Sequence, residues 1–306
     1  MSFIQELTDS IKEKKSVVCM GLDPRMDEKG QIPNYLIEKH SLPSDTILEF
    51  NKMLIDATYD LIPIIKPNIA FYEKYDSLDA LKETIKYANK KGLLVLLDSK
   101  RNDIGSTCEA YAHANFKVYN ADATTVNAYF GIDGIKPFLR YKDNGTFVLV
   151  KTSNPSSTEF QDLFSIEKSE LPNKTTELEL SSVKLERNYI HMAKLIRKWS
   201  KSLETYRGYH HLGMVVGATY PDELIKIRQI AKSSYILLPG FGAQGAGVED
   251  IKYAFDENGL GGIVNSSRGI MFAYKKNKKY GSEEFPKAAR EEVKKMNAEI
   301  NKVISL

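Results

Sequence analysis

Several features that define other protein classes are scarce in this chain. Only two of its 306 residues are cysteine, Cys19 and Cys108, so a reducing compartment such as the cytoplasm is expected rather than a fold stapled by disulfides. No secretory hydrophobic region opens the sequence, and the acidic residues near the N-terminus argue against a transit peptide. The longest apolar runs are about six residues, far short of the ~20 that span a membrane, so no membrane partner is expected.

Charge of one sign and metal-binding patterns are scarce as well. Forty-three basic against 40 acidic residues leave a net charge of +3, which is too little for a protein whose partner is a long polyanion. No nucleic-acid partner is therefore expected, although a small anion could bind locally. The five histidines show no paired metal spacing and neither cysteine has a companion ligand nearby, so no metal site is predicted.

Short apolar runs recur along the chain, each followed by a polar turn and a segment of helical period. Eight such runs occupy residues 17–23, 61–68, 93–100, 121–129, 146–154, 214–219, 235–242 and 261–268. They are apolar throughout rather than alternating, which suits parallel strands covered by helices. Eight strand-helix units predict a (β/α)8 barrel (TIM barrel) as a single domain over residues 1–306, with a doubly wound open sheet as the alternative.

The segments between the runs predict helices. Ser77 opens and Gly92 closes a segment with its apolar residues on one face, and residues 3–11 have the spacing of an N-terminal packing helix. Apolar stripes mark two further helices, at residues 47–57 and 192–199. A polar insertion at about 156–187 has no clear period, which predicts either a functional lid or a disordered segment.

Polar side chains gather at one end of the predicted strands. They fall at or just beyond the carboxyl ends of apolar runs: Asp23, Lys66, Asn68, Asp98, Lys100, Ser153, Thr219 and Arg268. In a (β/α)8 barrel these ends converge on one mouth, which carries the chemistry.

The stretch LLDSKRNDIGST, residues 96–107, holds the densest charge cluster. Asp98 and Lys100 are two apart on a strand, which directs both side chains to one side, and Lys66 ends the neighbouring strand. This predicts a lysine, aspartate, lysine row, whereas the spacing leaves the place of Asp103 open. The row is either a self-satisfying ion-pair network or a site that holds a protonated lysine against a developing carbanion.

The same stretch resembles the Asp-x-Lys-x-x-Asp-Ile-Gly-x-Thr signature of the orotidine 5′-phosphate decarboxylase family. Six further motifs of that family occur in the same order: GLDP at 21–24, KPNIAFYE at 66–73, VLVKTSNPSS at 148–157, VVGAT at 215–219, LLPGFGAQ at 237–244 and VNSSRGI at 264–270. The arrangement is most similar to the family branch that carries the KPN and KTSNP motifs.

The resemblance implies an activity and a set of catalytic residues. The reaction would be the cofactor-independent decarboxylation of orotidine 5′-monophosphate to uridine 5′-monophosphate (UMP), the last step of de novo pyrimidine nucleotide synthesis. Lys100 would protonate C6 as carbon dioxide leaves, flanked by Asp98 and Asp103, and Lys66 would complete the tetrad. Asp103, with Ile104 and Thr107, would reach into the neighbouring subunit's site, which implies a homodimer with shared active sites.

The resemblance also assigns the substrate-binding residues. Asp23 and Asn68 are similar to ribose-hydroxyl ligands, and Thr152 and Ser153 to the pair that reads the pyrimidine edge. The remaining residues resemble the phosphate end of the site: Pro239, Gln244, Ser267 and Arg268. Ser267 is a departure, because some relatives have glycine there, but its backbone amide can still donate a hydrogen bond.

Three alternatives are weighed against this interpretation. GFGAQG at 240–245 fits a dinucleotide-binding G-x-G-x-x-G, but it falls in the seventh unit and no acid lies near residue 265. Asp98 and Asp103 could hold Mg²⁺ for sugar-phosphate decarboxylation or aldol addition, although Ser153 in its pyrimidine-reading motif argues against that. A barrel that only binds nucleotide would be expected to have lost one of the four charged residues, and all four are intact.

Overall fold

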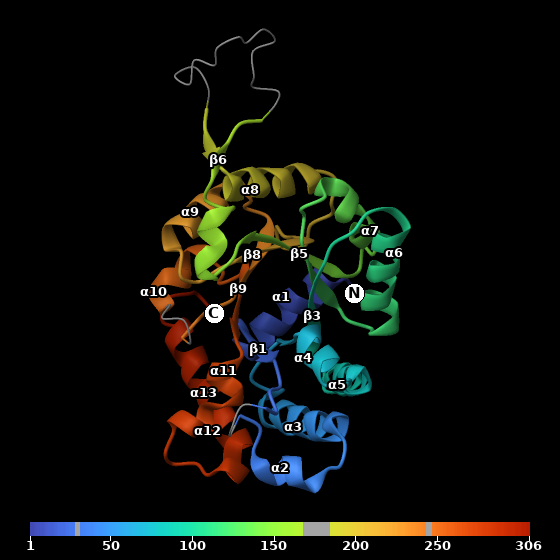
Figure 1. Cartoon of the computed structure of the whole chain (residues 1–306). Helices are drawn as coiled ribbons and strands as arrows, with labels where there is room; N and C mark the ends of the chain where they lie inside the picture. Colours follow the sequence, from blue (N-terminus) through green and yellow to red (C-terminus); the bar gives the residue numbers. More distant parts are fainter. Residues whose placement is uncertain (28–30, 168–183, 243–246) are drawn as a thin grey trace.

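The structure is a computed structural model that describes residues 1–27, 31–167, 184–242 and 247–306. Eight parallel strands close into a barrel in which neighbours follow one another in the chain (Figure 1). The strands are β1 (Val18–Leu22), β2 (Ile64–Pro67), β3 (Leu94–Arg101), β4 (Ala123–Val126), β5 (Gly145–Lys151), β8 (His210–Val216), β9 (Ser234–Leu238) and β10 (Gly262–Ser266). Because β1 pairs with both β2 and β10, the predicted (β/α)8 barrel is confirmed and the open sheet is wrong.

Helices surround the barrel. They are α1 (Phe3–Lys14), α2 (Asn34–Lys39), α3 (Pro43–Thr58), α4 (Ile69–Lys74), α5 (Leu78–Lys90), α6 (Gly105–His113), α7 (Lys136–Leu139), α8 (Asn188–Trp199), α9 (Pro221–Ile230), α10 (Val248–Ile251), α11 (Arg268–Met271), α12 (Ala273–Lys276) and α13 (Phe285–Ile300). Gly92 follows α5 with a φ of +73°, as its predicted role at the helix end requires. Ser77 precedes α5, but its hydroxyl donates to the carbonyl of Tyr75 instead of capping the helix. No described helix is long and apolar enough to cross a bilayer.

Helix α1 lies across one end of the barrel (Figure 1). Phe3 is buried and meets Phe147 of β5 edge to face, with ring centroids 6.0 Å apart. At the first residue of β5, Gly145, a Cβ atom would lie 2.5 Å from the Phe3 ring, so the helix packs on the amino ends of the strands. The opposite, carboxyl ends are left to form a site.

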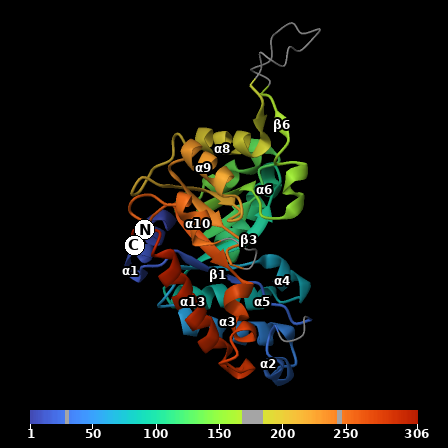
Figure 2. The same cartoon turned by 90° about the vertical axis from the view of Figure 1, so that its left-hand side faces the viewer.

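The polar insertion is ordered at both of its flanks. Residues Pro155–Glu159 form a short 3₁₀ helix, and β6 (Phe164–Ser165) pairs antiparallel with β7 (Glu186–Arg187). This strand pair projects beyond the helices next to α8 (Figures 1 and 2). Residues 168–183 of the predicted insertion lie outside the described residues, so the alternative of a lid or a disordered segment stays a prediction.

Candidate active site

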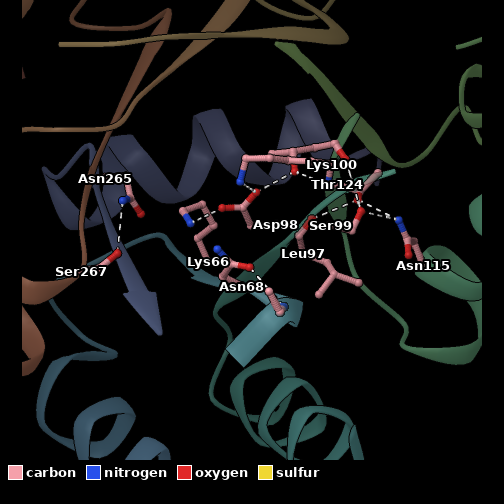
Figure 3. Close-up of polar contacts among 12 residues, drawn as sticks. Lys66, Asn68, Leu97, Asp98, Ser99, Lys100, Asn115, Thr124, Asn265 and Ser267 are labelled. Atoms are coloured by element: carbon pink, nitrogen blue, oxygen red, sulfur yellow. Dashed lines mark hydrogen bonds and ion pairs between the residues drawn. The ribbon is translucent and has the colours of Figure 1, made fainter. Parts of the chain in front are cut away.

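Three charged side chains meet at the carboxyl ends of β2 and β3 (Figure 3). The Asp98 carboxylate accepts from Lys66 Nζ at Oδ2 and from Lys100 Nζ at Oδ1, both at 2.6 Å. The side chains of Lys66 and Asp98 are only 5% and 8% exposed, whereas that of Lys100 is 47% exposed. Lys100 is therefore the member of the row that a substrate can reach.

The electrostatics of the row keep the buried pair ionised. Burial alone would raise the pKa of Asp98, but the ammonium groups of Lys66 and Lys100 outweigh it and hold that pKa well below its usual range. Burial likewise opposes the charge on Lys66, but Asp98 and Asp23 raise the pKa of Lys66 above its ordinary value. The row is thus a fixed alternation of positive, negative and positive charge.

The backbone under Lys100 departs from regular strand geometry. Lys100 has a φ of +47°, in the left-handed region, and the register between β3 and β4 shifts between Leu97 and Arg101. Asp98 and Lys100 nevertheless lie on one side, where their charged ends meet, whereas the Ser99 hydroxyl between them contacts Thr124 and Asn115. The predicted placement of the two side chains on the same side is therefore confirmed, and the bulge in the backbone is what the sequence did not predict.

Asp103 lies apart from the row. Its Oδ1 accepts from the backbone amide of Ile104 at 2.8 Å, and no cation among the described residues lies within ion-pair distance of it. Ile104 and Thr107, at the start of α6, are exposed. Within one subunit the structure does not bring these three residues to the site.

The row lies between two adjoining cavities that share Lys66, Asp98 and Pro239. We call the cavity of about 410 Å³ the first lobe; it is lined by Lys66, Asp98, Lys100, Thr125, Leu149, Thr152, Ser153, Asn154, Gln161, Val215, Leu237 and Pro239. The second lobe, of about 300 Å³, is lined by Asp23, Arg25, Lys66, Asn68, Asp98, Pro239, Gly240, Phe241, Asn265, Ser266, Ser267 and Arg268. The two lobes bring together every predicted site residue except Asp103, Ile104, Thr107 and Gln244, the last of which lies outside the described residues.

The second lobe presents polar groups from β1, β2 and β10. The Oδ1 of Asp23 is buried and has no hydrogen-bond partner among the described residues, so it can accept from a ligand. Asn68 caps α4 by accepting from the amide of Ala70 at 3.2 Å. Ser267 packs against Gly21, where a Cβ atom would lie 1.9 Å from the serine hydroxyl, which explains the glycine of GLDP. Arg268 is exposed at the start of α11.

In the first lobe, the sequence did not single out Thr125, Asn154 or Gln161. Gln161 holds Thr152 twice, since its Oε1 accepts from the Thr152 amide and its Nε2 donates to the Thr152 hydroxyl, both at 2.8 Å. The Lys151 ammonium, fully buried, donates to Asp162 at 2.9 Å and ties the segment that carries Gln161 to the end of β5. No local motif signals Gln161, because its contact depends on how the insertion folds back.

The fold and this site are those of (β/α)8-barrel enzymes, which place their chemistry at the carboxyl ends of the strands. Residues 16–282 match the family described as orotidine 5′-phosphate decarboxylase / HUMPS, and the chain belongs to that family. The prediction of the family is confirmed.

Relatives match over nearly their whole length. The orotidine 5′-phosphate decarboxylase of Rhodopirellula baltica is 39% identical over 95% of this chain and 93% of its own. That of Caldicellulosiruptor saccharolyticus is 38% identical over the whole of both chains. Among solved structures, the OMP decarboxylase of Leishmania donovani is 30% identical with a TM-score of 0.75, covering 99% of this chain and 98% of its own. These relatives carry the name of a carboxy-lyase.

Proposed function

We propose that this protein converts orotidine 5′-monophosphate to UMP without a cofactor and that Lys100 delivers a proton to C6. The observation that carries the proposal is the Asp98 carboxylate held between two ammonium groups, with Lys100 half-exposed in a cavity of about 410 Å³. Asp98 accepts a hydrogen bond from Lys100 Nζ and keeps it in place, and Lys66 in turn holds Asp98. The C6–carboxylate bond breaks and carbon dioxide leaves; the electron pair of that bond stays on C6 and takes a proton from Nζ, and the neutral amine regains a proton from solvent.

Magnitudes indicate that neither repulsion of the substrate carboxylate nor one positioned ammonium group can account for the rate enhancement alone. A pyrimidine carbanion without an electron sink places the required rate enhancement near the upper end of the usual 8 to ~23 kcal/mol. Repulsion between Asp98 and a substrate carboxylate about 4 Å away is on the order of 4 kcal/mol at an effective dielectric of 20. A positioned ammonium group adds roughly 3 to 5 kcal/mol. Most of the remainder must come from binding the distant parts of the substrate.

The two lobes suit the parts of a nucleotide. The pyrimidine would occupy the first lobe, with its edge against Thr152 and Ser153, and the ribose hydroxyls would meet Asp23 and Asn68. The phosphate would lie at the outer side of the second lobe, against Pro239, Gln244, Ser267 and Arg268. Because phosphate binding would help to assemble the site around C6, orotidine without its phosphate should lose kcat/KM by orders of magnitude. Comparable values for the two substrates would refute this assignment.

We further propose a homodimer in which Asp103, Ile104 and Thr107 complete the partner's site. Asp103 bonds to the amide of Ile104 and makes no ion pair with the described lysines of its own row, which leaves it available to a second subunit. The next residue, Ile104, is 54% exposed. Phe130 lies near the loop that carries Asp103, since both approach Gly134, and the ring of Tyr129, which is 74% exposed, lies against the Phe130 ring. Exposed apolar side chains of this size around a charged loop are typical of an interface between subunits.

Mixed dimers test the shared site. Lys100→Ala and Asp103→Ala homodimers should each be inactive, whereas a heterodimer of the two regains one site with both residues intact. Activity should therefore return when the variants are dissociated and mixed, with heterodimers verified by differential tags. Mixtures that stay inactive would mean that Asp103 does not serve its neighbour.

Two controls separate the proposal from the alternatives. A Mg²⁺-dependent sugar-phosphate activity would vanish in excess EDTA, whereas the proposed reaction should continue unchanged. A barrel that only binds nucleotide would bind UMP in calorimetry without releasing carbon dioxide from orotidine 5′-monophosphate. The proposal places the protein in the cytoplasm with this small nucleotide as its substrate, and with neither nucleic acid nor membrane as a partner.

A further inference from the structure

One hydroxyl group touches both Asp98 and the backbone of Lys100. Thr125, buried in β4, donates from Oγ1 to Asp98 Oδ1 at 2.8 Å and accepts from the Lys100 amide at 3.0 Å. Figure 3 shows Asp98 with its two lysine partners, Lys66 and Lys100. The same Asp98 Oδ1 accepts from the Lys100 ammonium, and Lys66 donates to Asp98 Oδ2.

The register of the barrel leaves Thr125 alone opposite this part of β3. Leu97 pairs with Thr124 and Arg101 with Val126, so residues 98–100 of β3 face the single residue Thr125 of β4. The extra residues form the bulge that places Lys100 at a φ of +47°. A non-glycine residue keeps such a conformation only where its surroundings determine it, and the Thr125 hydroxyl provides the hydrogen bond that does so.

We propose that Thr125 is a positioning residue for the reaction assigned to Lys100. It fixes the backbone of the bulge at Lys100, and it holds the Asp98 carboxylate in the orientation that receives the Lys100 ammonium. Its second role arises within the catalytic cycle, because Lys100 becomes neutral after giving its proton to C6. Asp98 Oδ1 then loses one charged partner, and the Thr125 hydroxyl still donates to it, so the carboxylate stays in place for reprotonation. This inference rests on the proposed decarboxylation.

The neighbouring hydroxyl network serves as a contrast. Thr124 Oγ1 donates to the carbonyl of Leu97 at 3.0 Å and accepts from Asn115 Nδ2 at 2.8 Å, and Asn115 also donates to Ser99. These bonds tie β3 and β4 to the helical segment Ala114–Val118 that follows α6 (Figure 3), but none of them touches Asp98 or Lys100. Thr124 is as buried as Thr125, so it provides a matched control for the loss of a buried threonine hydroxyl.

The test compares Thr125→Val, Thr125→Ser and Thr124→Val in the full-length protein. Thr125→Val keeps the branched shape and removes only the hydroxyl; kcat should fall by about 10- to 100-fold, the equivalent of one lost buried hydrogen-bonding group. KM and the Kd for UMP should change by less than about threefold, since no assigned substrate contact is lost. Thr125→Ser should restore kcat to within a few-fold, and Thr124→Val should lower Tm without a selective loss of kcat.

The possible results are distinguishable. If the wild type decarboxylates the substrate and Thr125→Val has an unchanged kcat, the role of Thr125 is wrong while the proposed function stands. A fall in kcat that Thr125→Ser does not rescue, or an equal fall in Thr124→Val, would assign the hydroxyl a merely structural role and overturn it as well. Wild-type protein that binds UMP but releases no carbon dioxide would overturn the proposed function and this inference together.

Discussion

Two largely enclosed lysine–aspartate ion pairs lie at the carboxyl ends of the barrel strands, and they differ in whether a ligand can reach them. Lys66 and Asp98 are 2.6 Å apart at the ends of β2 and β3, and Lys151 at the end of β5 is 2.9 Å from Asp162. Asp98 takes a second ammonium group, Lys100, that faces a cavity. Lys151 is instead enclosed, with its ammonium 4.6 Å from the centre of the Tyr220 ring and a third contact to Ser157.

The comparison shows that burial and ion pairing do not by themselves make a reactive site. Desolvation is costly for both pairs, and each is stable only because further partners satisfy its charges. The row of Lys66, Asp98 and Lys100 differs because it contains a second ammonium group, that of Lys100, which is 47% exposed and lines a cavity that a ligand can enter. In the second pair, the further contacts of Lys151 are to Ser157 and the Tyr220 ring, so the pair stabilises the fold.

The largest effect should follow loss of the accessible charge. Lys100→Ala removes the proposed proton donor, so kcat/KM should fall by about 10³-fold or more. The side chain is half-exposed and Asp98 keeps its bond to Lys66, so Tm should stay near that of the wild type. Decarboxylation assays and thermal melts check both expectations, and retention of kcat within tenfold would remove Lys100 from its assigned role.

Loss of the enclosed Lys151 charge should instead lower stability and leave kcat nearly unchanged. Lys151→Met leaves Asp162, whose side chain is 16% exposed, with Arg187 as its remaining cationic partner, so the free energy of unfolding should fall by roughly 3 kcal/mol, the low end for a broken buried pair. At temperatures where the variant is folded, its kcat should stay within tenfold of the wild type.

A double variant provides the control for that prediction. Lys151→Met combined with Asp162→Leu removes both charges, and Arg187, the other partner of Asp162, lies 40% exposed where water can solvate it. Most of the lost stability should therefore return, as measured by urea unfolding. A double variant that is less stable than Lys151→Met alone would contradict the view that this pair is a satisfied structural unit.

The two pairs also show how far the sequence carries the interpretation. Lys66 and Lys151 each follow an apolar run and precede polar residues, so the local sequence pattern alone does not distinguish their roles. The eight strands and the meeting of Lys66, Asp98 and Lys100 were predictable, because apolar periodicity and parallel strands bring these ends together. The resemblance to the family assigned roles to Lys66 and Lys100 and none to Lys151, although Lys151 opens the KTSNP motif.

The remaining features depend on register and on long-range folding. The bulge at Lys100 and the contacts of Thr125 follow from the pairing of β3 with β4, which the residues of either strand do not specify. His210 and His211 were not assigned to a strand, yet they begin β8 and are buried there. Gln161 and Asp162 reach the barrel only because the insertion folds back along β5.

A third prediction contrasts Asp98 with another largely enclosed carboxyl group. Asp122 lies before β4 and accepts from the Val95 amide at 2.8 Å. Burial, together with the nearby negative charge of Glu6, raises its pKa to about 6, because the Val95 hydrogen bond offsets only part of the desolvation. Its folded pKa exceeds the unfolded value, so the folded state binds more protons between about pH 4 and 6, and stability falls as pH rises through that window. Asp98 behaves oppositely: its pKa is lowered, so its contribution is present at neutral pH and is lost only in acid.

Asp122→Asn therefore should stabilise the protein at pH 8, by up to about 3 kcal/mol for a shift of this size, because the amide keeps an acceptor for Val95 without a buried charge. The gain should shrink toward pH 4, where the wild-type carboxyl group is already protonated. Urea unfolding of the two proteins at several pH values measures it. A gain that is the same at pH 4 and pH 8 would show that proton binding at Asp122 is not its cause.

The smallest predicted effect links the structural pair to the site. Gln161 stands next to Asp162 and holds Thr152, part of the proposed pyrimidine-reading pair, by two hydrogen bonds. Gln161→Leu removes both bonds while keeping a similar volume, so KM for orotidine 5′-monophosphate should rise by about tenfold, the equivalent of one net hydrogen bond to a positioned group. Because Lys66, Asp98 and Lys100 are untouched, kcat should change less than KM.

A double variant tests whether the Lys151–Asp162 pair acts through Gln161. Lys151→Met, which loosens the segment that carries Gln161, should also raise KM. Combining it with Gln161→Leu should raise KM little further, since both substitutions act on Thr152. Fully additive effects would mean that the enclosed pair influences the site by some route other than Gln161.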